Sequence, residues 1–312
     1  MPEQEYHWLP RTDILSLEEM ARLVQVFAHA GVRRIRFTGG EPLLRRELHA
    51  LIAMVASIVE IEDLALTTNG FLLATQAADL HAAGLQRLNI SLDTLQRERF
   101  HKITQRDALA EVLEGIRVAQ EVGFTGTKID TVMMRGQNED EIIDLLEFSG
   151  ANSLKLRFIE YMDVGGATQW SENQVLNRDA ILERVEDHYG AIEALEPLDP
   201  SAPARIYRLR NGLEFGIIAS TSTPFCGECD RSRVAADGAW YSCLYAKHGV
   251  SLRELLRDGR DDQSLADAIA ELWRARADRG AEERKAQKQR GPAIDLEDLI
   301  ADPHLEMHTR GG

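Results

Sequence analysis

Hydrophobic positions in the first half of the chain alternate between helical spacing and short continuous runs. From Ser16 to Gly31 apolar residues recur at helical spacing, Ser16 and Glu19 form a capping-box pair, and a glycine ends the segment. The same spacing predicts further helices at 45–59, 74–83, 107–122 and 138–149. Between them, short apolar runs predict strands at 32–40, 63–68, 87–92, 126–134 and 154–161.

Strands that alternate with helices predict βαβ units and a parallel sheet, because a parallel neighbour needs a crossover connection. The fold class is therefore α/β. In such sheets the chemistry gathers at the carboxyl ends of the strands. Four short segments, TGGEP, TTNG, SLD and IEYMD, stand at or just past predicted strand ends. We expect them to converge on one face and to build one site.

The pattern changes beyond residue 165. A helix is predicted at 177–189, a hairpin at 205–220 that turns at Asn211-Gly212, and helical structure again at 250–280. The stretch 281–292 is highly charged, and we expect it to be mobile. We divide the chain into a barrel domain at 1–165 and a C-terminal segment at 166–312.

Charge and hydropathy exclude several classes of protein. The formal net charge of the 312 residues is −15, whereas a duplex nucleic-acid surface normally needs a basic footprint. No apolar run reaches the roughly 18 residues of a membrane span, and the first 15 residues lack a signal core. We expect a cytoplasmic protein with neither nucleic acid nor membrane as a partner.

The chain contains three cysteines, and all of them fall in one short stretch. Cys226 and Cys229 form a C-x2-C pair, and Cys243 follows. This clustering favours metal binding over a disulfide framework or inert buried thiols. Three thiolates leave one coordination position open, although His248 would complete a zinc site. The spacing alone suits zinc and an iron-sulfur cluster equally well.

Two other segments are suited to binding a ligand. Arg231 and Arg233 occupy alternate positions after the cysteine pair, and arginine binds phosphate bidentately. An isolated pair of this kind is as often a solvated basic edge. Gly39 and Gly40 at a strand end let a ligand approach the backbone, or they form an ordinary strand-to-helix turn.

Taken together, these motifs resemble one family. FTGGEPLLRREL, LTTNG, LNISLD, RFIEYMDVG, PFCGECDRSRVAADG, the closing GG and the opening MPEQEYHWLPR are similar, in order, to the molybdenum cofactor biosynthesis protein A family, the radical S-adenosylmethionine GTP 3',8-cyclases. The resemblance implies a partial TIM-type (βα)6 barrel, without its first strand here, and a C-terminal cluster-binding segment. It also implies conversion of GTP to (8S)-3',8-cyclo-7,8-dihydroguanosine 5'-triphosphate, the first step of molybdopterin synthesis.

The resemblance also implies roles for particular residues. The positions that match S-adenosylmethionine contacts are Gly40, Ser91 and Met162. Those that match GTP contacts are Arg36, Thr67, Lys128, Arg231, Ser232 and Arg233. Cys226, Cys229 and Cys243 would hold a C-terminal [4Fe-4S] cluster with one open iron, and Gly311 and Gly312 would reach into the active site. The implied partners are an electron donor, the next enzyme of the pathway and a second copy of the chain.

One family motif is absent from the 312 residues. The family's C-x3-C-x2-C motif, which holds the cluster that cleaves S-adenosylmethionine, ends immediately before the residues that match Met1-Pro2-Glu3. We expect the upstream reading frame to encode it. A second cluster is expected only with that motif, and a chain that truly begins at Met1 is expected to be inactive. Two alternatives are a non-catalytic GTP-binding module, stabilised by zinc or a cluster, and a radical enzyme that modifies peptides.

Overall fold

A computed structural model describes residues 9–311 of the chain. Within this range a sheet of eight strands has the order β1-β2-β3-β4-β5-β8-β7-β6. Its first six strands pair in parallel: β1 (Arg34–Phe37), β2 (Asp63–Thr68), β3 (Arg87–Ser91), β4 (Lys128–Met133), β5 (Lys155–Glu160) and β8 (Glu214–Ile218). The antiparallel strands β7 (Arg205–Arg208) and β6 (Glu193–Ala194) extend one edge.

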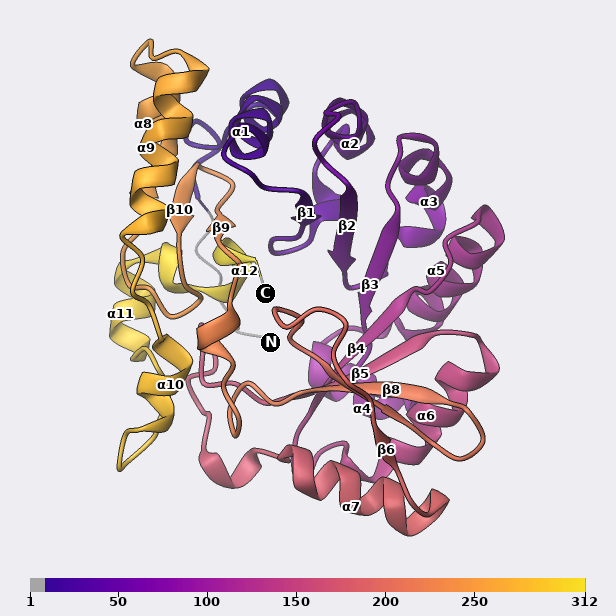
Figure 1. Cartoon of the computed structure of the whole chain (residues 1–312). Coiled ribbons are helices and arrows are strands. Elements are labelled where there is room, and N and C mark those ends of the chain that lie inside the picture. The colour runs from indigo at the N-terminus through magenta and orange to yellow at the C-terminus, as the bar shows by residue number, and fades with distance from the viewer. Residues whose placement is uncertain (1–8, 312) are drawn as a thin grey trace.

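The sheet curves, and helices cover its convex face (Figure 1). These helices are α2 (Leu48–Ala56), α3 (Leu73–Ala82), α5 (Leu109–Val122) and α6 (Ile142–Ala151). The predicted α/β class is confirmed, and the arrangement is that of a partial barrel. The predicted strands agree with the observed ones to within two residues, except that β1 is shorter. The short helix α4 (Arg97–Thr104), which follows β3, was not predicted.

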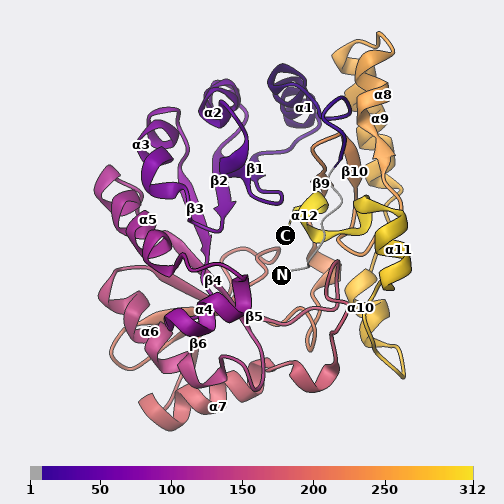
Figure 2. The same ribbon diagram turned by 180° about the vertical axis from the view of Figure 1, so that it is seen from behind.

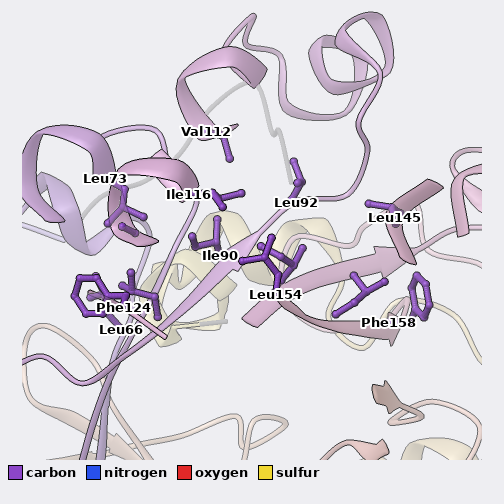
Figure 3. Close-up of a cluster of buried hydrophobic side chains, with 14 of the residues drawn as sticks. Leu66, Leu73, Ile90, Leu92, Val112, Ile116, Phe124, Leu145, Leu154 and Phe158 are labelled. Carbon is purple, nitrogen blue, oxygen red and sulfur yellow. The ribbon is translucent and has the colours of Figure 1, made fainter. Parts of the chain in front are cut away.

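The core lies between the sheet and these helices. Alternate residues of a strand point to opposite faces, so Leu66, Ile90 and Phe158 turn outward and pack against helical side chains. Figure 3 shows part of this cluster, with Leu73 of α3 and Val112 and Ile116 of α5 lying against β2 and β3. Burying the outward side chains leaves the inward residues of each strand to line the concave face.

The first helix, α1 (Leu17–His29), begins as predicted. The Glu19 amide donates to Ser16 Oγ at 3.1 Å, and the Ser16 amide donates to Glu19 Oε2 at 2.9 Å. The predicted hairpin is also present, since β7 and β8 are antiparallel and Gly212 turns between them with φ of +88°. The helix predicted at 177–189 is α7 (Arg178–Tyr189), capped by Asn177.

The C-terminal segment stands beside the open edge of the sheet (Figures 1 and 2). It contains a small sheet of β9 (Arg233–Val234), β10 (Ala239–Tyr241) and β11 (Val250–Ser251), and the helices α8 (Leu252–Arg257), α9 (Asp262–Arg274), α10 (Gly280–Lys285), α11 (Leu296–Ala301) and α12 (Met307–Arg310). Phe27 of α1 packs against Trp240 and Ile269 in a second buried cluster. Short 3-10 turns lie at Pro42–Leu44 (η1), Glu139–Glu141 (η2), Glu172–Gln174 (η3), Cys226–Glu228 (η4) and Pro303–Leu305 (η5).

The expectation that 281–292 is mobile is wrong. Its first residues belong to α10, and Arg284 and Arg290 both donate to the carboxylate of Asp163, at 2.8 and 2.9 Å. Asp163 is fully buried, and the side chain of Arg290 is only 7% exposed. The prediction from charge composition was wrong because a buried carboxylate in the loop after β5 neutralises two of the segment's cations.

The sheet spans the division proposed at residue 165. β8 lies after that residue, yet it pairs in parallel with β5 over Leu156–Ile159. The division into 1–165 and 166–312 stays a prediction. Among the helices of residues 9–311, none has the length and apolar character needed to cross a bilayer.

Candidate active site

Four cations gather on the concave face of the sheet. Arg36 of β1, Arg87 of β3, Lys128 of β4 and Arg157 of β5 influence one another electrostatically. Desolvation lowers the pKa of Arg36, and repulsion from Arg157 and Arg87 lowers it further. Desolvation and the cations Arg157, Arg87 and Arg36 together lower the pKa of Lys128 to about 8. A face that gathers four cations is suited to a polyanion.

Carboxylates neutralise only two of these four cations. Arg157 forms a bidentate pair with Asp130, with distances of 2.6 Å from Nε to Oδ1 and 2.5 Å from Nη2 to Oδ2, and Arg87 pairs with Asp63. Within residues 9–311, neither Arg36 nor Lys128 forms an ion pair. These two cations, both expected from the family resemblance, are therefore available to a ligand.

Unpaired polar atoms lie on the same face. The strand register places Thr67 opposite Asn89, and Asn89 opposite Lys128. Thr67 Oγ1 and Asn89 Oδ1 are both buried without a hydrogen-bond partner among the described residues. An unsatisfied buried polar atom costs roughly 1–3 kcal/mol, so such atoms call for a ligand or water. Thr67, predicted to contact GTP, thus faces the expected side of the sheet.

The loops after β1 and β2 are joined by one carboxylate. Glu41 of the TGGEP segment accepts from Thr68 Oγ1 at 2.7 Å and from the Asn69 amide at 2.8 Å, which belong to the TTNG segment. Gly39 has φ of +140°, a conformation that favours glycine, and Gly40 beside it is exposed. The expected approach of a ligand to this backbone is sterically open.

Ser91 and Met162 lie at the same rim as Gly40. Ser91 is the exposed last residue of β3, and Met162 lies two residues past the end of β5. The carboxyl ends of parallel strands meet at one edge of a sheet, so the three positions expected to bind S-adenosylmethionine share that edge. Their contacts with the cofactor stay a prediction.

A buried carboxylate at the end of β5 orders the chain that leads to the cysteines. Glu160 is fully buried and accepts from the amides of Thr221 and Ser222, at 3.0 and 2.7 Å, and from the amide of Arg178 at 2.8 Å. Since Cys226 follows four residues after Ser222, Glu160 fixes the start of the cysteine segment against the sheet.

The three cysteines are free, half-buried thiols in cationic surroundings. Burial acts to raise the pKa of Cys229, but hydrogen bonds from the Arg231 backbone and the Arg276 side chain outweigh it and lower that pKa. Arg231 Nη2 lies 3.5 Å from Cys229 Sγ. Stabilised thiolates are the donors that iron-sulfur clusters and zinc require, so the donor chemistry fits either group.

The three thiols do not form a site for a single metal ion. Among the residues from 9 to 311, no three side chains of His, Cys, Asp or Glu converge closely enough to hold a metal ion. His248, the alternative fourth zinc ligand, is exposed. A single zinc ion would therefore require ligand side chains to reorient, whereas a [4Fe-4S] cluster bonds each thiolate to a different iron and needs no such convergence.

The C-terminal tail, here residues 302–311, contacts both the TGGEP loop and the Arg231–Arg233 segment. Arg233 Nε donates to the carbonyl of Gly311 at 3.2 Å, and desolvation, with repulsion from Arg231, lowers the pKa of Arg233 to about 10. A Cβ added to Gly311 would lie 2.5 Å from Thr38 Cγ2. In both views α12 lies beside β9, inside the curve of the sheet (Figures 1 and 2).

Ser232 is exposed between the two arginines, and Gly312 lies outside the described residues.

The expected GTP residues therefore form two groups. One is on the sheet, with Arg36, Thr67 and Lys128, and the other surrounds the cysteines, with Arg231 and Arg233; Gly311 lies between Thr38 and Arg233. Sequence reasoning missed Arg87 and Arg157, although charged residues inside otherwise apolar strands were a visible signal. It also missed Glu160 and Asp163, whose roles depend on distant partners.

Comparisons with known proteins agree with this geometry. The radical SAM superfamily matches residues 4–149, and Molybdenum Cofactor Synthesis C matches residues 154–282. GTP 3',8-cyclase 1 of Mycobacterium tuberculosis is 51% identical over 100% of this chain and 88% of its own length. GTP 3',8-cyclase of Staphylococcus carnosus is 40% identical over 91% of this chain and 84% of its own length.

Solved structures show the fold alone. Streptococcus suis SuiB is 15% identical, with a TM-score of 0.55, over 88% of this chain and 62% of its own. Native anSMEcpe, with bound AdoMet and the Cp18Cys peptide, is 14% identical, with a TM-score of 0.52, over 90% of this chain and 86% of its own. With a relative this similar over the whole chain, and a parallel α/β sheet of radical SAM type, the chain belongs to the GTP 3',8-cyclase family of radical SAM proteins.

Proposed function

We propose that this chain is a GTP 3',8-cyclase, a radical SAM lyase that converts GTP to (8S)-3',8-cyclo-7,8-dihydroguanosine 5'-triphosphate in molybdenum cofactor biosynthesis. The proposal is supported by 51% identity to a GTP 3',8-cyclase over the full chain. The observation that carries it is the pair of unneutralised cations, Arg36 and Lys128, on a concave face beside two unpaired polar atoms. Such a face suits a nucleoside triphosphate.

The chain's residues contribute binding and orientation. Arg36, Lys128, Arg231 and Arg233 would hold the triphosphate, and Thr67 and Ser232 would add hydroxyl contacts. Fixing the ribose and the base relative to each other matters because C3', after loss of its hydrogen, must bond to C8 of the same molecule. Positioning of this kind can supply a large part of a rate enhancement.

The cofactor sites are proposed on the rim and at the cysteines. Gly40, Ser91 and Met162 would contact S-adenosylmethionine, which, with a [4Fe-4S] cluster, supplies the radical that removes the ribose 3'-hydrogen. Cys226, Cys229 and Cys243 would hold the C-terminal [4Fe-4S] cluster, which would supply an iron with an open coordination position for the substrate. The lowered pKa of Cys229 supports thiolate ligation.

The test combines binding with turnover. Lys128→Met should weaken GTP binding and lower formation of the cyclised product in anaerobic protein with both clusters, S-adenosylmethionine and a reductant. Lys102→Met, an exposed lysine on α4, is the matched control and should change neither. Unchanged GTP affinity in Lys128→Met would refute the assignment of the concave face. Zinc in place of iron at the cysteines would favour the non-catalytic module.

A further inference from the structure

One guanidinium connects the C-terminal tail to the loop that carries Cys243. Arg310 is the last residue of α12 and directly precedes Gly311. Although charged, it is only 3% exposed, and its guanidinium lies 4.5 Å from the centroid of the Tyr241 ring. A buried arginine needs several acceptors to offset its lost hydration, so its contacts indicate what it holds together.

The acceptors of Arg310 belong to both segments. Nε donates to the carbonyl of His304, in the tail. Nη1 donates to the carbonyl of Leu244 at 3.1 Å, and Nη2 lies 3.5 Å from the carbonyl of Lys247. Leu244 and Lys247 belong to the stretch 242–247, here called the Cys243 loop. A single planar group thus spans from the tail to a loop with a predicted cluster ligand.

Packing between the two segments is incomplete. A pocket of about 360 Å³ lies among the loop, the tail and α10, and its lining includes Cys243, Leu244 and Lys247 from the loop, and Leu305, Met307 and Arg310 from the tail. Where side chains do not fill a space, they cannot transmit a displacement from one wall to the other. Arg310 lines this pocket, and its guanidinium donates both to the tail and to the loop.

The other end of the tail is closely confined. Gly311 adopts φ of +75°, accepts from Arg233 and leaves no room for a Cβ beside Thr38. A small shift of Arg310 would therefore move Gly311 out of its position against the TGGEP loop.

We propose that Arg310 is a positioning residue that couples the Cys243 loop to the tail, so that ordering of the loop by a bound cluster also orders Gly311. The proposal rests on the proposed function only in assigning the cluster to Cys243. Arginine suits this task because its planar guanidinium can donate hydrogen bonds to acceptors in two directions at once, whereas the donors of lysine all lie on one nitrogen.

His304 provides a matched control. Its ring lies 2.7 Å from Asp237 Oδ2 and 3.0 Å from Asp302 Oδ1, so it ties the tail to the turn before β10. Its side chain has no hydrogen bond to the Cys243 loop among the described residues. Replacing it removes an anchor of the tail but leaves the carbonyl that Arg310 uses.

The experiment is backbone hydrogen exchange on the full chain, before and after reconstitution with ferrous iron and sulfide. In the parent protein, reconstitution should slow exchange in both the 242–247 and 305–311 peptides. In Arg310→Ala it should slow the loop alone. In His304→Ala the tail should exchange faster throughout, yet still slow on reconstitution. Tail slowing in Arg310→Ala equal to that in the parent would overturn the proposal, as would a parent tail that does not respond.

Arg310→Lys keeps the proposal testable if the alanine variant does not fold. Its tail response should be clearly smaller than that of the parent, and an equal response would contradict the coupling. The measurement uses neither GTP nor turnover, so the coupling and the cyclase activity can fail separately. In active enzyme, Arg310→Lys should lower kcat while GTP affinity stays within about twofold.

Discussion

Arg233 donates a hydrogen bond to the carbonyl oxygen of Gly311, although 78 residues separate them in the chain. The contact joins the segment after the cysteine pair to the tail, and Thr38 on the other side of Gly311 belongs to the TGGEP loop. Three segments that sequence reasoning treated as separate motifs therefore meet at one glycine.

Gly311→Ala should lower cyclisation far more than it weakens GTP binding. Alanine at φ of +75° costs about 1–2 kcal/mol, and its Cβ would collide with Thr38 Cγ2. We expect turnover to fall roughly 5- to 30-fold, as that energy implies, with GTP affinity nearly unchanged. Single-turnover product formation and equilibrium GTP binding would separate the two effects, and equal turnover would show that the tail has no role.

GTP affinity should fall as the pH rises through about 8. The pKa of Lys128 is lowered to about 8, so its positive charge is present below that pH and is lost above it. Bound triphosphate would stabilise the charged form, so the midpoint should shift upward in the complex. Lys128→Arg, which stays charged, should flatten the profile between pH 7.5 and 9.5, roughly one to two units around that pKa. A parent profile as flat as that of the arginine variant would contradict this assignment.

Glu41→Gln should loosen the rim where S-adenosylmethionine is proposed to bind. The Glu41 carboxylate accepts hydrogen bonds from Leu43, Thr68 and Asn69. Glutamine keeps one oxygen acceptor, but its NH2 group would face a donor that the carboxylate now accepts from. We expect a loss of about 1–3 kcal/mol in unfolding free energy, measured by denaturant titration. Glu62→Gln, on the exposed turn before β2, should be near neutral.

Asp163→Asn should release the segment that follows α10. The change leaves Arg284 and Arg290 with a neutral partner, and breaking a buried pair typically costs about 3–5 kcal/mol. Burial acts to raise the pKa of Asp163, but Arg290 and the other hydrogen-bond partners of this carboxylate outweigh burial and lower the pKa. The stability that the Asp163 ion pairs contribute is therefore lost only at acid pH. Limited proteolysis should cut 285–292 in the variant and spare it in Asp258→Asn, where an exposed pair is affected.

Cys243→Ala should abolish metal binding at the cysteine segment, whereas His248→Ala should leave metal content unchanged. Three thiolates suffice for a cluster with an open iron, while zinc would need the fourth ligand. Iron, sulfide and zinc content of anaerobically prepared variants would decide between them. Metal loss in the histidine variant would favour the zinc module.

The sequence predicted those features whose cause is local. The Ser16 capping box, the Asn211-Gly212 turn and the strands with outward apolar residues depend on neighbours within a few positions, and all are present. Features that depend on distant partners were missed. Arg290 looked like part of a solvated charged stretch because nothing near it in the chain reveals that it meets Asp163.

The same distinction applies to the candidate site. The family resemblance identified Arg36 and Lys128, and the structure explains their availability by showing that Asp130 and Asp63 neutralise their neighbours. That explanation required the strand register, which hydrophobic periodicity does not specify. That no three ligand side chains among residues 9–311 converge on a single metal ion likewise follows from side-chain placement rather than from cysteine spacing.

The pairing of β8 with β5 also bears on how the chain is made. During synthesis, β5 leaves the ribosome more than 50 residues before its neighbour begins at Glu214. For that interval its outer edge presents unpaired amides and carbonyls, a state prone to association with other chains. The nascent barrel is therefore exposed to misassembly until the hairpin has emerged, and a fragment that ends near residue 165 would keep that edge permanently open.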